Sequence, residues 1–115
     1  MEIKRSNPAN NRMNSIVEYG QFVYLAGIVA EGSNITEQTQ KVLKNIDDLL
    51  EKAGSDKHHI LRATIFLKDM SLFSEMNAVW DKWVTIETAP ARATMQASLA
   101  GPDFLIEIII DAVKK

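Results

Sequence analysis

“LIEIIIDAV”, residues 105–113, is the stretch that decides how this chain of 115 residues must fold. Its apolar side chains fall on both sides of an extended strand, with Ile106, Ile108 and Ile110 on one side and Leu105 and Ile109 on the other. A strand that is apolar on both faces is typical of a sheet covered on both sides. The stretch therefore predicts a central strand, and Glu107 is the charged residue that interrupts its isoleucines.

A first helix is predicted from about residue 35 to residue 53. Asn34 and Glu37 have the spacing of a capping box, and Gly54 stands where a glycine often ends a helix. Between them, apolar residues recur at helical spacing: Val42, Leu43, Ile46, Leu49, Leu50 and Ala53. This pattern predicts one apolar face directed at a sheet.

A second helix is predicted over about 71–86. Either Asp69 or Ser71 could cap it, and Pro90 forbids its continuation. Strands are predicted over residues 14–19, 21–26, 60–67, 91–99 and 105–113, with a further short strand at 2–5 as an option. The order favours one α+β domain over 1–115, with a mixed sheet of five to six strands and two helices.

Composition restricts the class of protein. With 46% hydrophobic and 24% charged residues and a net charge of −2, the chain resembles a globular protein and not a nucleic-acid-binding one. It has no cysteine, hence no disulfide, thiolate nucleophile or sulfur metal site, which favours a cytoplasmic location. No secretion signal or membrane-spanning run is apparent, so we expect no membrane partner.

The number of sheet faces predicts self-association. Two helices can cover only one side of a sheet of this size, yet strand 21–26 is also apolar on both faces. A lone subunit would expose a larger apolar patch than monomers usually tolerate. We therefore expect a homo-oligomer whose sheets pack on one another, with clefts between the subunits.

Three polar residues are candidates for chemistry. Arg92 and Thr94 share one face of their strand, opposite its alanines, and Glu107 lies among isoleucines. The alternative for Arg92 is an exposed cross-strand pair with Asp111, formed if the last two strands make a hairpin and worth only ~0.2–1 kcal/mol.

Other chemistry finds little support in the sequence. His58 and His59 lie side by side in a hydrophilic segment, which favours a solvated turn over a metal site that needs three or four ligands. No glycine-rich phosphate loop, nucleophile elbow or helix-borne zinc motif is present.

Four features together resemble the reactive intermediate deaminase family, RidA or YjgF-like: “ATIFLKD” (63–69), Asn77, “APAR” (89–92) and “IEI” (106–108). The similarity extends from about Val17 to Val113. It implies a fold like that of bacillus-type chorismate mutase, assembled as a homotrimer with three clefts between subunits. It also implies the activity of a 2-iminobutanoate/2-iminopropanoate deaminase: hydrolysis of 2-imino acids, or their enamine tautomers, to 2-keto acids and ammonia.

The resemblance also implies roles for individual residues. Arg92 would hold the substrate carboxylate through two parallel hydrogen bonds, and Glu107 would orient or deprotonate the attacking water. Thr94 stands where many members have cysteine, which suggests a hydrogen-bonding wall. The backbone around Gly27 and the amide of Asn77 match other cleft positions. No metal or organic cofactor is implied.

Two departures from the family pattern make the expected cleft less polar. Met13 stands where a tyrosine is typical, and Ile28 where a glutamine is common. Two other functions stay open: a non-catalytic trimer that binds small carboxylates or regulates, which needs Arg92 but not Glu107, and a ribonuclease or translation inhibitor. The latter would need a basic surface, which the net charge of −2 disfavours.

Overall fold

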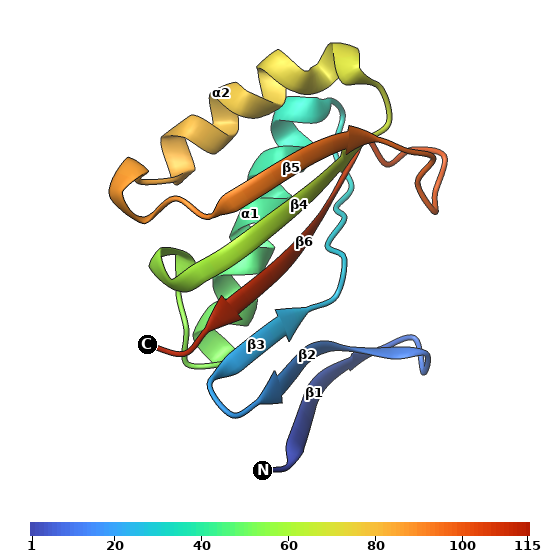
Figure 1. Cartoon of the computed structure of the whole chain (residues 1–115). Coiled ribbons are helices and arrows are strands. Elements are labelled where there is room, and N and C mark those ends of the chain that lie inside the picture. Colours follow the sequence, from blue (N-terminus) through green and yellow to red (C-terminus); the bar gives the residue numbers. More distant parts are fainter.

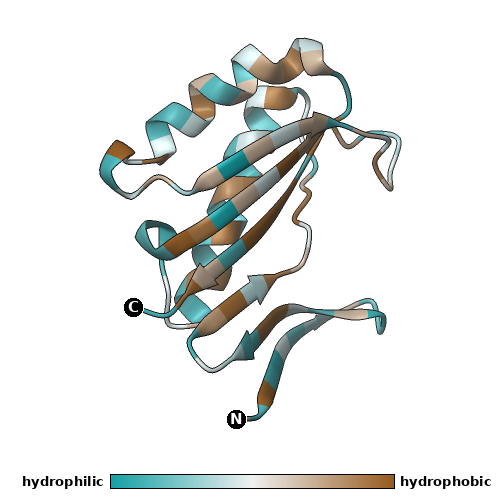
Figure 2. Cartoon of the chain, in the orientation of Figure 1, coloured by the Kyte–Doolittle hydropathy of each residue, from teal (hydrophilic) through white to brown (hydrophobic).

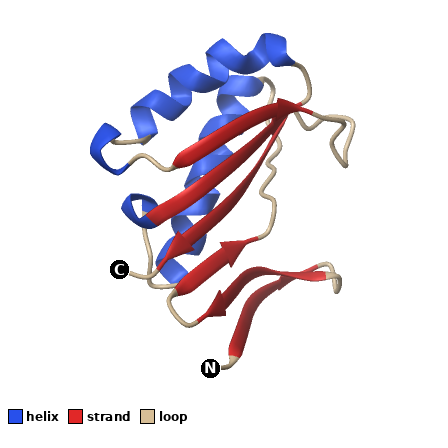
Figure 3. Cartoon of the chain, in the orientation of Figure 1, coloured by secondary structure: helices blue, strands red, loops and turns tan.

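The computed structural model describes all residues, 1–115, and has the predicted α+β architecture of one mixed sheet with two helices on one face (Figures 1 and 3). The strands are β1 (Ile3–Ala9), β2 (Met13–Tyr19), β3 (Phe22–Leu25), β4 (Ile60–Leu67), β5 (Ala91–Gln96) and β6 (Ile106–Val113). The helices are α1 (Ile35–Lys52) and α2 (Phe73–Trp83). Neither helix is long and apolar enough to cross a lipid bilayer.

Local sequence signals predict the bounds of α1 more accurately than those of α2. The Asn34 side chain accepts a hydrogen bond from the Glu37 N–H at 2.9 Å, and α1 ends one residue before the predicted position. The second helix is shorter than predicted, because Asp69 caps a separate 3-10 turn, Met70–Leu72, through the Ser71 N–H. At its other end the chain becomes extended at Val84, the first residue of a β-branched run that disfavours helix.

The strand order is β1-β2-β3-β6-β4-β5, so β4 lies between the last two strands. The hairpin considered for those strands is therefore wrong. Arg92 pairs in parallel with Ala63, whereas Asp111 pairs with Arg62. Strand β5 ends at Gln96 because the chain must then cross the end of β4 to reach β6. Two backbone hydrogen bonds fix this crossing: the Ala97 N–H donates to the Leu67 carbonyl, and the Lys68 N–H donates to the Leu105 carbonyl.

The two faces of the sheet differ in what covers them. The helices cover a core that includes Ile16, Val23, Ile65, Leu67, Ile106, Ile108 and Ile110, all at most 1% exposed. We call the other side the open face; strand alternation and pairing place Tyr19, Phe22, Tyr24, Thr64, Phe66, Met95, Glu107, Ile109 and Asp111 on it.

Four large side chains of the open face, Tyr19, Phe22, Tyr24 and Met95, are 41–47% exposed. Figure 2 shows apolar residues along strands whose open side no helix covers. The predicted uncovered apolar face is present in the single subunit.

Candidate active site

Arg92 lies on β5, and Figure 1 shows this edge strand next to α2. Its side chain points to the helix side of the sheet, because Arg92 pairs with the buried Ala63. Its Nη1 donates a hydrogen bond to Oδ1 of Asn77 at 2.8 Å. The guanidinium carbon lies 5.3 Å from the ring centroid of Trp80 and 5.7 Å from that of Phe73. Helix α2 therefore supplies every side-chain partner recorded for this guanidinium.

The three partners come from one face of α2 because Phe73, Asn77 and Trp80 are spaced i, i+4 and i+7. No carboxylate of the chain lies within ion-pair distance of Arg92, whose remaining N–H groups make no hydrogen bond to the protein. A partly buried cation without an acidic partner is suited to bind an anion from outside the chain.

The polar face of β5 turns toward the helices. The alternation of Ala91, Ala93 and Met95 along the strand would instead suggest that the apolar face packs in the core. Those three side chains lie on the open face and are exposed. The reversal is tolerated because the two aromatic rings of α2 contact the guanidinium of Arg92, and cation–π contacts stabilise a charge that has left water.

Thr94 lies two residues beyond Arg92, on the same face. Its hydroxyl oxygen is buried and has no hydrogen-bond partner. An unsatisfied buried hydroxyl costs about 1–3 kcal/mol, so a ligand or water that reached it would remove that cost. The hydrogen-bonding role expected of Thr94 stays a prediction.

Glu107 lies on the open face, since Ile106 and Ile108 on either side of it are the residues buried under the helices. The segment after β3 runs beside β6, with hydrogen bonds of 2.9 and 3.1 Å between Ile28 and Ile108. A Cβ atom at Gly27 would collide with the Glu107 carboxylate. The carboxylate therefore lies directly against the Gly27 backbone.

The structure thus forms two groups of predicted site residues and does not bring them together in one chain. Arg92, Asn77 and Thr94 lie on the helix side at the β5 edge. Glu107 lies on the open face of β6, and Gly27 contacts it from the segment after β3. Strand β4 lies between the two groups. A cleft that contains both groups would have to include a second copy of the chain.

The two departures from the family pattern occupy different environments. Ile28 is 9% exposed and packs in the core under the helices, opposite to Glu107. Met13 is 47% exposed on β2. Both also line a cavity of about 390 Å³ beside Gly27 and the second half of α1. Only Met13 presents an exposed side chain that could alter a shared cleft.

The histidine segment forms a turn held by hydrogen bonds. His59 Nδ1 lies 2.6 Å from Oδ1 of Asp56, and His58 Nδ1 lies 2.8 Å from the Thr88 hydroxyl. The hydrogen bond with His59 is the main cause that lowers the pKa of the Asp56 carboxyl below its ordinary value. No group of three or more His, Cys, Asp or Glu side chains is arranged to hold a metal ion.

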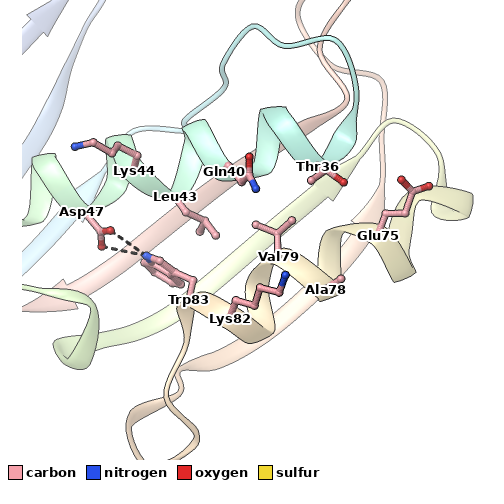
Figure 4. A pocket seen from close by; sticks show the side chains of 10 residues that line it. All are labelled: Thr36, Gln40, Leu43, Lys44, Asp47, Glu75, Ala78, Val79, Lys82 and Trp83. Atoms are coloured by element: carbon pink, nitrogen blue, oxygen red, sulfur yellow. Dashed lines mark hydrogen bonds between the residues drawn. The ribbon is translucent and has the colours of Figure 1, made fainter.

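A groove of about 420 Å³ between α1 and α2 lies elsewhere (Figure 4). The indole Nε1 of Trp83 donates to the Asp47 carboxylate at 3.0 and 3.2 Å, and this bond closes one end of the groove. None of the predicted site residues lines it.

The contacts of Phe73 and Trp80 with Arg92 were not predicted from the sequence. Trp80 is buried, with 5% of its surface exposed. The spacing of both rings about Asn77 on one helical face was the available signal.

Comparison with known proteins covers almost the whole chain. Residues 4–114 match the protein family described as Endoribonuclease L-PSP. A RutC family protein of Haemophilus influenzae is 43% identical over 115 residues, with 97% of this chain and 98% of the relative covered. The RutC family protein YoaB of Escherichia coli is 42% identical over 105 residues, with 90% of this chain and 92% of the relative covered.

The fold agrees with solved structures as well. The structure of NMB1025 from Neisseria meningitidis, described as a member of the YjgF protein family, superposes with a TM-score of 0.96 at 42% identity. The superposition covers 100% of this chain and 97% of that chain.

Proposed function

The chain belongs to the RidA/YjgF family, and from this premise we propose that it hydrolyses reactive 2-imino acids to 2-keto acids and ammonia in clefts between the subunits of a homotrimer. The observation that carries the proposal is the guanidinium of Arg92. It is held by Asn77 and two aromatic rings, is partly buried, and lacks an acidic partner.

A 2-imino acid offers the group that this guanidinium would bind. Its carboxylate is planar and can accept two parallel hydrogen bonds from the free N–H groups of Arg92. The imine carbon is attached directly to that carboxylate, so anchoring one end fixes the reacting atom. The unpaired hydroxyl of Thr94 would then gain a partner in the ligand or in a bound water.

Hydrolysis needs a positioned water molecule and a path for its proton. The water oxygen bonds to the imine carbon, and a proton from the water moves to the imine nitrogen. The remaining hydroxyl proton then moves to the same nitrogen, the C–N bond breaks as the carbonyl forms, and ammonia leaves. Glu107 is the group that would orient this water and carry the protons, because its carboxylate is fixed against Gly27 on the open face.

Two copies of the chain are needed for this chemistry. Strand β5 is a free edge of the sheet, so Arg92 can approach the open face of another subunit, where Glu107 lies. The same contact would cover the exposed aromatic side chains of that face. The free edge strand and the exposed apolar face therefore support the assembly that the mechanism requires.

A binding protein for small carboxylates is the second candidate. The anchor around Arg92 is complete within one subunit, whereas the Glu107 group lies on the other face. Such a protein would bind 2-keto acids without turnover. An RNA-cleaving function receives less support, because a net charge of −2 does not favour a phosphate backbone.

The test is release of ammonia from iminopropanoate generated in situ, with pyruvate as the second product. Arg92→Ala should lower kcat/KM by about 10- to 100-fold and weaken 2-keto acid binding, because it removes a charge-assisted bidentate contact. Arg92→Lys should recover part of the binding only. Glu107→Gln should leave binding intact and lower kcat by ~10²–10⁴-fold.

Matched controls exist on the outer surfaces of the helices. Lys82→Ala removes an exposed cation from α2, and Glu51→Gln removes an exposed carboxylate from α1. Both should keep wild-type turnover. Wild-type ammonia release by Arg92→Ala would contradict the deaminase proposal, and turnover equal to wild type in Glu107→Gln would remove Glu107 from the mechanism.

A further inference from the structure

We propose that Phe73 and Trp80 are positioning residues that hold Arg92 ready for a carboxylate, an inference that rests on the proposed role of Arg92 as anchor. Together with Asn77 they form what we call the α2 clamp. Arginine has a long side chain with high rotamer entropy, and binding is stronger when that entropy has been lost beforehand. The α2 clamp supplies this preorganisation within a single subunit.

The geometry assigns different tasks to the three clamp residues. Asn77 accepts one N–H of Arg92 at 2.8 Å and fixes the rotation of the guanidinium plane. Trp80, with its indole centroid 5.3 Å from the guanidinium carbon, attracts the cation without using any of its hydrogen-bond donors. Phe73 does the same from 5.7 Å.

The ring faces suit this task because they offer no hydrogen-bond acceptor that would compete with a ligand for the N–H groups of Arg92. A carboxylate in place of either ring would hold the guanidinium as firmly, but it would occupy the N–H groups that a ligand needs. Aromatic rings leave those groups free. The α2 clamp therefore orients the cation and preserves its capacity for a bidentate contact.

Rigidity of the clamp follows from burial. Trp80 is 5% exposed and packs against Trp83 with ring centroids 5.3 Å apart, and Trp83 is bonded in turn to Asp47 of α1. The orientation of Arg92 thus depends on the packing of α2 on α1, although neither Trp83 nor Asp47 is among its recorded partners.

The experiment is an NMR titration of the full chain with 2-oxobutanoate, compared among clamp variants. Trp80→Leu and Phe73→Leu should each raise the Kd by about three- to thirty-fold. Trp80→Phe, which keeps a ring, should recover most of the affinity. In an Arg92→Ala background the same substitutions should have no effect on the Kd, because their action passes through Arg92.

Trp83→Leu is the matched control. It removes a neighbouring tryptophan from the same helix and loses the bond to Asp47, so it reports the effect of weaker helix packing. It should lower the melting temperature with a smaller change in Kd than Trp80→Leu. If Trp80→Leu does not fold, the half-buried Phe73 provides the decisive variant in both backgrounds.

A second readout uses the two tryptophans of the chain. Trp83→Phe leaves Trp80 as the sole tryptophan, and 2-oxobutanoate should then change its fluorescence in an Arg92-dependent manner. Unchanged Kd values in Phe73→Leu and Trp80→Leu, together with weaker binding in Arg92→Ala, would overturn the α2 clamp alone. Unchanged binding in Arg92→Ala would overturn the proposed anchor itself.

Discussion

The space between Gly27 and the Glu107 carboxylate is too small for a methyl group. The segment that carries Gly27 is tied to β6 by the two hydrogen bonds between Ile28 and Ile108, so its backbone cannot retreat freely. Gly27 does not have a positive φ, so the glycine is needed for this close approach and not for its conformational freedom. The carboxylate therefore depends on the glycine for its position.

Gly27→Ala should lower the kcat of deamination at least about tenfold, because the added methyl displaces the Glu107 carboxylate from the water that it orients. Binding of 2-oxobutanoate through Arg92 should persist. Steady-state kinetics and the same NMR titration measure the two effects separately.

Gly54→Ala is the control for a glycine substitution in this chain. Gly54 has a φ of +76° and open space around its Cα, so alanine there strains the backbone without touching another residue. It should lower the free energy of unfolding by about 1 kcal/mol and leave kcat unchanged. Full kcat in Gly27→Ala would show that the position of Glu107 does not matter for turnover.

At the scale of elements, the helices and most strands could be predicted from local patterns. Asn34 and Glu37 predicted the start of α1 because a capping box is a purely local interaction. The place of β5 could not be predicted, since closeness in sequence suggested a hairpin with β6, whereas β5 pairs in parallel with β4 through the crossover that contains α2.

The arrangement of the candidate site could not be predicted from the sequence, and the roles of its residues stay predictions. Alternation correctly grouped Arg92 with Thr94, but it could not reveal that their face turns toward α2, because a polar strand face normally predicts solvent. The partners that make this orientation tolerable, Phe73 and Trp80, come from another element. Their contact depends on tertiary packing, which periodicity within one strand does not encode.

The turn between α1 and β4 supplies a prediction on acid stability. The hydrogen bond from His59 lowers the pKa of Asp56 in the folded state, with further contributions from the His58 backbone N–H and from Lys115. Because its pKa is lower in the folded state, the carboxylate stabilises the fold at pH values above its unfolded pKa of about 4. This stabilisation is lost as the pH falls through the folded pKa. The carboxylate is 35% exposed, so the contribution is at most ~1 kcal/mol.

Asp56→Asn should therefore lower the free energy of unfolding at pH 6–7, and its difference from wild type should shrink below about pH 4. Denaturant unfolding at a series of pH values measures this. Glu51→Gln, which removes an exposed carboxylate without an ion pair, is the control and should change stability little. A difference for Asp56→Asn that grew on acidification would contradict the assigned interaction.

At the scale of the whole molecule, the open face is the reason why we expect self-association. Phe22 and Tyr24 stack with centroids 6.4 Å apart on a surface that no helix covers. Burial of such a face is driven by apolar area, which salt does not screen, so we expect an association that changes little with ionic strength. The same association would bring Arg92 of one subunit toward Glu107 of another.

Subunit mixing tests this central claim most directly. Arg92→Ala and Glu107→Gln should each form a homotrimer with at most about a tenth of the wild-type activity. After joint denaturation and refolding in equal amounts, about a quarter of the clefts should pair an intact Arg92 with an intact Glu107 from the other variant. The account predicts that ammonia release from iminopropanoate, averaged over all clefts of the mixture, then returns to about a quarter of the wild-type rate. A refolded mixture of trimers that stays as inactive as its two parents would contradict a site shared between subunits.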